Sequence, residues 1–121
     1  MTSAAHILLV EDDSAIRESV AECLQSEGHA VHAARNGAVA LAWLREGNRP
    51  TLVVLDLVMP VMDGARFLQA LRSEPALRDL PAVLMTAAMA SPANPLPLAT
   101  AYLEKPFELA ALLEVVERLS R

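Results

Sequence analysis

The sequence predicts an α/β fold in which a parallel five-stranded sheet is covered by helices on both faces. Five short apolar runs alternate along the chain with segments whose apolar residues recur at helical spacing. This alternation is typical of strand–helix–strand units, whose right-handed crossovers build three layers with the sheet in the middle. At 121 residues and 54% hydrophobic composition, the chain fits one domain with a substantial core. We therefore expect residues 1–121 to form a single doubly wound domain.

The first strand and helix lie on either side of an acidic segment. Residues 7–10 are uniformly apolar, as in a short buried strand. The acids and the hydroxyl of residues 11–14 can cap the following helix, which we expect over residues 15–26 because its apolar residues keep helical spacing. Gly28 stands where a helix C-cap glycine is common. A second, less apolar strand follows over residues 30–34.

The central part of the chain contains the most uniform apolar strand. Asn36 begins a turn, and a second helix follows that ends near Gly47. Residues 52–55 form a buried strand that leads directly into the carboxylate of Asp56. The Asp-Gly pair at 63–64 signals a turn before a third helix with an apolar face.

The last third of the chain departs from regular alternation. Residues 82–85 form a buried strand that ends at Thr86. Residues 87–100 hold three prolines and no charged residue, so a normal helix is not expected there. A short strand over residues 101–104 and an amphipathic helix whose apolar face runs over residues 109–119 complete the predicted fold.

Composition and isolated residues exclude several classes of protein. The net charge is -5 and the chain has no run of Lys or Arg, so direct nucleic-acid binding is not expected. The apolar stretch near the N-terminus is too short for a signal peptide or a membrane span, which predicts a cytoplasmic protein without membrane insertion. The single cysteine, Cys23, excludes an internal disulfide and fits a helix core position. Neither His29 nor His32 lies beside a second metal-ligand candidate at useful spacing, so a metal role is not expected for them.

Polar residues suited to metal or phosphoryl chemistry follow four of the predicted strands. They are Asp12, Asp13, Asp56, Thr86 and Lys105. The carboxyl ends of parallel strands meet at one edge of the sheet, which is where open α/β folds bind ligands. Crowded carboxylates repel one another unless a cation joins them, and an all-oxygen site suits Mg²⁺. We therefore expect a Mg²⁺ site at this edge.

Asp56 is the candidate reactive group of that site. A carboxylate whose neighbours are neutralised by Mg²⁺ can attack phosphorus and form an aspartyl-phosphate. Thr86 can donate to one phosphoryl oxygen, and Lys105, the only lysine among ten basic residues, can hold another. Taken singly, an acid after a strand is usually a helix cap and a threonine there a turn hydroxyl. Their joint occurrence at corresponding strand ends favours a functional site.

Four segments, in order and over essentially the whole chain, resemble the signature motifs of the receiver domain of two-component response regulators. They are Val-Glu-Asp-Asp at 10–13, Leu-Asp-Leu-Val-Met-Pro-Val-Met-Asp-Gly at 55–64, Met-Thr-Ala at 85–87 and Tyr-Leu-Glu-Lys-Pro-Phe at 102–107. The resemblance implies a flavodoxin-like (βα)5 fold and a phosphorylation-dependent signalling switch. The implied partner is a sensor histidine kinase or a histidine phosphotransfer protein, which would supply the phosphoryl group.

The resemblance also implies which residues bind Mg²⁺. Asp12 and Asp13 are the implied metal pair, joined by Asp56 and by the backbone carbonyl of Val58. Asp56 is the implied phosphoacceptor. The only catalysis implied is the domain's own Mg²⁺-dependent phosphoryl transfer and dephosphorylation, so the chain is not expected to be a conventional enzyme.

Three further residues are implied to read the phosphorylation state. Thr86 and Lys105 would bind the phosphoryl group, and Tyr102 would follow the inward movement of the Thr86 hydroxyl. Phosphate supplies a physical cause, because it adds negative charge and strong acceptor oxygens. Residues 87–100 depart from the family pattern, since they are short, proline-rich and lack a charged helix. We therefore predict that the family's fourth helix is short, displaced or absent.

Two alternative functions remain open at this point. A haloacid-dehalogenase-type phosphatase also forms an aspartyl-phosphate, but it needs a second acid two residues after the first, where this chain has Val58. A receiver-like interaction module that works without phosphorylation usually lacks one of the acids, the threonine or the lysine, all of which are present here. No DNA-binding effector domain is expected within these 121 residues.

Overall fold

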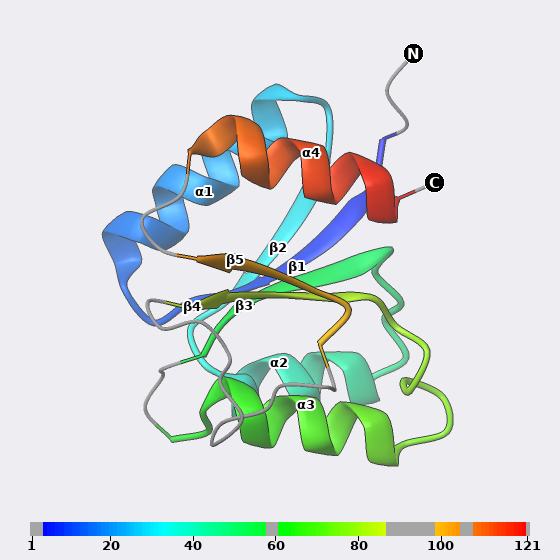
Figure 1. Ribbon diagram of the computed structural model, residues 1–121. Helices are drawn as coiled ribbons and strands as arrows, with labels where there is room; N and C mark the ends of the chain where they lie inside the picture. The colour runs from blue at the N-terminus through cyan, green and yellow to red at the C-terminus, as the bar shows by residue number, and fades with distance from the viewer. Residues whose placement is uncertain (1–3, 58–60, 87–98, 105–107, 121) are drawn as a thin grey trace.

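A five-stranded parallel sheet forms the middle layer of the protein, in the order β2-β1-β3-β4-β5 (Figure 1). The computed structural model describes residues 4–57, 61–86, 99–104 and 108–120. The strands are β1 (His6–Val10), β2 (Ala30–Ala34), β3 (Leu52–Asp56), β4 (Ala82–Thr86) and β5 (Ala101–Glu104). All five predicted strands are confirmed, and three of them extend one residue beyond the expected bounds.

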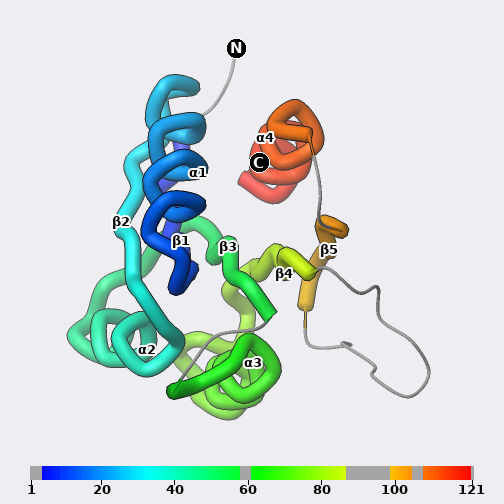
Figure 2. The backbone as a smooth tube through the Cα atoms, turned by 90° about the vertical axis from the view of Figure 1, so that its left-hand side faces the viewer, coloured from blue at the N-terminus to red at the C-terminus, as the bar shows by residue number. Residues whose placement is uncertain are grey.

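Helices cover both faces of the sheet, as predicted for a doubly wound fold. Within the described residues they are α1 (Ser14–Ser26), α2 (Gly37–Arg45), α3 (Gly64–Ser73) and α4 (Leu109–Leu119). Helices α1 and α4 lie on one face, and α2 and α3 lie on the other (Figures 1 and 2). None of the helices in the described ranges has the length and apolar composition needed to cross a bilayer. The segment predicted to be irregular falls almost entirely in residues 87–98, outside the described residues.

The core consists of two apolar layers, one on each side of the sheet. Leu8 and Val10 of β1 pack towards α2 and α3, whereas Ile7 and Leu9 pack towards α1 and α4. Strands β3 and β4 are buried along their whole length. Burial on both faces explains why these strands are continuous apolar runs in the sequence rather than alternating ones.

The strand order reverses between β1 and β3. The chain crosses from β1 to the edge strand β2, returns to β3 on the other side of β1, and continues outward through β4 and β5. Loops that leave neighbouring strands in opposite directions open a crevice at the carboxyl ends, where doubly wound sheets bind ligands. The register pairs Val10 with Leu55, so the residues that follow each of them lie side by side in this crevice.

Side-chain caps fix where three helices begin. Asp13, Asn36 and Asp63 each accept a hydrogen bond from the backbone amide three residues later, at 3.0, 2.9 and 2.9 Å respectively. Such caps satisfy amides that have no partner within the helix and typically stabilise it by about 1 kcal/mol. Gly28 and Gly47, with φ of +92° and +104°, follow the ends of α1 and α2. The capping side chains therefore explain where α1, α2 and α3 begin, and the two glycines explain where α1 and α2 end.

His29 and His32 make local contacts, as expected, whereas Cys23 is only partly buried and is not a full core residue. The His32 ring stacks on Trp43 with a centroid separation of 4.2 Å. Burial, followed by the nearby Glu27 carboxylate, raises the pKa of the Cys23 thiol, which favours its protonated form. The buried His29 accepts a hydrogen bond from the backbone amide of Ala5 at its Nδ1 atom, over 3.0 Å.

We expect His29→Leu to lower the free energy of unfolding by about 1–3 kcal/mol, because the buried Ala5 amide loses its acceptor. Leucine keeps most of the side-chain volume, so the missing hydrogen bond dominates the change. Urea unfolding followed by circular dichroism measures the effect. An unchanged midpoint with an unchanged slope would show that water satisfies the Ala5 amide equally well.

Candidate functional site

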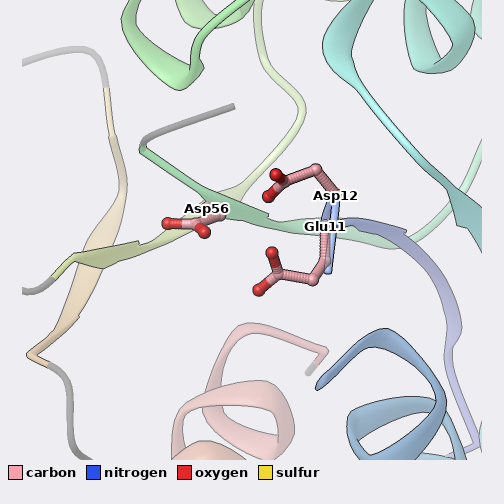
Figure 3. A group of neighbouring side chains, drawn as sticks. All are labelled: Glu11, Asp12 and Asp56. Carbon is pink, nitrogen blue, oxygen red and sulfur yellow. The ribbon is translucent and has the colours of Figure 1, made fainter. Parts of the chain in front are cut away.

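Three carboxylates converge in the crevice between β1 and β3. Oxygens of Glu11, Asp12 and Asp56 all lie within 4.8 Å of one another. Figure 3 shows Glu11 and Asp12, at the end of β1, directed towards Asp56 at the end of β3. The chain positions that meet here are far apart in the sequence and are brought together by the pairing of β1 with β3.

The burial of this cluster defines its chemistry. Glu11 is 1% exposed and Asp56 is 8% exposed, while Asp12 lies on the surface. Negative charges this close, two of them shielded from water, repel one another strongly unless a cation joins them. The donor atoms are all carboxylate oxygens, which suit Mg²⁺, and the exposed side of the cluster leaves room for the water ligands that Mg²⁺ keeps. The residues present therefore fit a divalent cation.

The cluster contains Glu11, for which the sequence predicts only a capping role. Asp13, the predicted second member of the metal pair, instead turns its Oδ1 atom to the Ile16 amide as the N-cap of α1. The structure thus brings Asp12 and Asp56 together as predicted, but with Glu11 as their companion. Because the three acids are consecutive, the sequence does not show whether Glu11 or Asp13 joins Asp12 beside Asp56.

The other wall of the site is a close backbone contact beside Asp56. Gly64 donates its backbone N–H to the Leu57 carbonyl at 2.7 Å. A Cβ atom at Gly64 would lie 2.6 Å from the Asp56 carbonyl oxygen and 2.8 Å from the Leu57 Cα. No side chain fits there without moving the backbone of Asp56. In the sequence the Asp-Gly pair at 63–64 predicts only a turn, because the partner of this contact is not visible in local sequence.

Thr86 and Tyr102 lie on the strands beyond β3. Thr86 is the last residue of β4 and is 2% exposed, while Tyr102 on β5 is partly buried against the α2 and α3 layer. The β4–β5 register pairs Tyr102 with Leu84, two residues before Thr86. Since alternate residues share a face of a strand, Thr86 and Tyr102 are diagonal neighbours on the same face.

Two predicted site residues, Val58 and Lys105, lie outside the described residues. Each follows a described strand closely: Val58 comes two residues after the end of β3, and Lys105 directly follows β5.

Comparisons with known proteins point to one family. The family model of the response regulator receiver domain matches residues 7–117. The response regulator MprA of Mycobacterium sp. (strain KMS) is 41% identical over 118 residues, which cover 95% of this chain and 50% of that protein. The chain thus spans about half the length of the curated relatives it matches.

Two solved structures extend the likeness to three dimensions. The chemotaxis response regulator CheY4 of Vibrio cholerae superposes with a TM-score of 0.87 at 31% identity, covering 97% of this chain and 99% of that one. The response regulator TrrA of Thermotoga maritima, solved in complex with Mg(2+)-BeF, has a TM-score of 0.83 at 34% identity, covering 94% and 97% of the two chains. With its sheet order, its carboxylate crevice and a family match over most of its length, the chain belongs to the response regulator receiver domains of two-component systems.

Proposed function

We propose that this domain is a signalling switch that accepts a phosphoryl group on Asp56 in a Mg²⁺-dependent reaction. The observation that carries the proposal is the convergence of Glu11, Asp12 and Asp56 within 4.8 Å at the switch point of the sheet. A lone buried carboxylate is a poor site for an anionic substrate, whereas a carboxylate that shares a divalent cation with two others is not.

In the proposed reaction, a carboxylate oxygen of Asp56 attacks the phosphorus of a phosphohistidine. An O–P bond to Asp56 forms as the P–N bond of the donor breaks, and the imidazole leaves. A sensor histidine kinase or a histidine phosphotransfer protein is the proposed donor. When bound, Mg²⁺ would neutralise charge on the phosphoryl oxygens and on the carboxylate cluster.

We assign the cation to Glu11, Asp12 and Asp56, with the Val58 carbonyl as a further candidate ligand. Asp13 as a ligand stays a prediction, and its position as N-cap of α1 favours Glu11 in that place. Thr86 and Lys105 are the proposed partners of the phosphoryl oxygens. The shared strand face of Thr86 and Tyr102 supports a route by which the aromatic ring responds to phosphorylation.

The proposal is tested by incubating the protein with acetyl phosphate and Mg²⁺ and measuring its intact mass. We expect the wild type to gain one phosphoryl group, and Asp56→Asn to gain none because an amide is not a nucleophile towards phosphorus. Excess EDTA should prevent the gain on the wild type. Equal labelling of the variant would overturn the assignment of Asp56.

A wild type that gains no mass while it binds Mg²⁺ would instead favour the other candidate, an interaction module that works without phosphorylation. The intact carboxylate cluster argues against that reading, because a module of that kind needs no cation site.

A further inference from the structure

The side chain of Arg17 reaches back from α1 to the loop that carries two of the three carboxylates. Its Nη1 atom donates to the backbone carbonyl of Glu11 at 2.8 Å and makes a longer contact of 3.4 Å with the carbonyl of Asp12. Arg17 therefore holds the main chain of both acids without using their carboxylates. The guanidinium of Arg17, a half-buried residue of α1, is thus a structural part of the site.

The segment of Glu11 and Asp12 departs from the usual direction of strand side chains, so its backbone needs to be held in place. Consecutive residues of a strand point to opposite faces, yet the carboxylates of Glu11 and Asp12 lie within 4.8 Å of each other and of Asp56. Glu11 still donates its N–H to Ala34 of β2 at 3.0 Å, as a strand residue does. The backbone bends at Asp12, directly after Glu11.

Two other hydrogen bonds secure this turn from the helix side. The Asp13 amide donates to Oε2 of Glu11 at 3.3 Å, and the Arg17 amide donates to the Asp13 carbonyl at 2.8 Å. The main chain of Arg17 thus anchors the first turn of α1, while its side chain anchors the two residues before the cap.

We infer that Arg17 is a positioning residue for the cation site, which tethers the Glu11 and Asp12 carbonyls so that their carboxylates converge on Asp56. This inference rests on the proposed function, since it concerns the same cation. Arg17 contributes geometry to the site rather than a ligand, and outer partners of this kind typically change metal affinity by about 10-fold to 100-fold.

The positive charge of Arg17 and its hydrogen bonds to the loop have opposite effects on Mg²⁺ affinity. The direction in which the affinity changes in a variant therefore tests the inference. A guanidinium near the cluster repels an incoming cation, so removing its charge alone would strengthen Mg²⁺ binding. Removing the tether lets the carboxylates move apart, which weakens binding. A weaker variant therefore reports the loss of positioning, and a stronger one reports only the loss of charge.

The experiment measures Mg²⁺ affinity by titration calorimetry on the wild type, Arg17→Met, Arg17→Lys and the control Arg118→Met. Arg118 lies in the last turn of α4, away from the carboxyl edge of the sheet. We expect Arg17→Met to bind Mg²⁺ about tenfold more weakly than the wild type. Arg17→Lys keeps the charge but has one nitrogen on a flexible stem, so it should also bind more weakly than the wild type. Arg118→Met should bind like the wild type.

Amide hydrogen exchange of the metal-free protein supplies a second readout. Faster exchange at the Asp13 amide in Arg17→Met is expected, because the loop loses its tether. If Arg17→Met does not fold, the Mg²⁺ affinity of Arg17→Lys alone decides the test.

An Arg17→Met affinity equal to or above that of the wild type, or an Arg17→Lys affinity equal to the wild type, would overturn the inference. A wild type that binds no Mg²⁺ would instead overturn the proposed function, which keeps the two failures distinct.

Discussion

Glu11→Gln weakens Mg²⁺ binding by more than about tenfold, whereas Asp13→Asn binds Mg²⁺ as the wild type does; this is the outcome we expect from the positions of the two acids. Glu11 contributes an oxygen to the cluster around Asp56 and is almost fully buried, so its charge faces the cation without screening by water. Glutamine keeps the shape of the side chain and removes only that charge. Titration calorimetry with MgCl₂ measures the difference.

The Asp13→Asn variant is the matched control for this experiment. Asp13 is exposed and its Oδ1 caps α1, a role that asparagine performs equally well. Both substitutions remove one carboxylate charge from the segment after β1, so equal weakening of the two variants would report the loss of charge there rather than the loss of a ligand. Weakened binding in Asp13→Asn with normal binding in Glu11→Gln would restore Asp13 as the ligand.

Gly64→Ala lowers the free energy of unfolding by about 1–3 kcal/mol and slows labelling by acetyl phosphate by about 10-fold to 100-fold. The new methyl group would lie 2.6 Å from the Asp56 carbonyl oxygen, which is closer than van der Waals contact allows. Backbone atoms cannot rotate away as a flexible side chain can. The main chain of Asp56 must shift, and its carboxylate shifts with it. Thermal unfolding and the rate of mass gain measure the two effects.

Gly37→Ala is the control for Gly64→Ala, because both glycines are the first residue of a helix that follows a capping side chain. A Cβ at Gly37 would meet the Met62 side chain and its carbonyl at 3.1 Å. This contact is milder, and the alanine also favours the helix, so a change within about 1 kcal/mol is expected. Equal losses of stability and labelling in the two variants would show that the Asp56 contact has no special role.

The strands and the helices that cover the sheet were predictable from the sequence because local physics specifies them. Uninterrupted apolar runs mark strands that are buried on both faces, and the structure places β3 and β4 in the centre of the fold with every residue buried. Asp56 stood out as the candidate reactive residue because it is the single carboxylate directly after the most apolar run. The cap candidates at residues 11–14 marked the start of α1, because an N-cap acts within three residues of itself.

Tertiary structure alone decided which acids share a site with Asp56. Glu11, Asp12 and Asp13 are three consecutive acids that the sequence alone does not distinguish. Each of them can cap a helix or bind a cation. Their roles depend on the backbone turn after β1 and on the pairing of Val10 with Leu55, which set where each carboxylate lies relative to Asp56. The close contact of Gly64 with Asp56 and the tether from Arg17 have the same origin. By itself the sequence predicted the fold class and singled out Asp56 as the candidate phosphoacceptor, whereas the acids that gather around Asp56 were decided by distances between chain segments that only the folded sheet brings together.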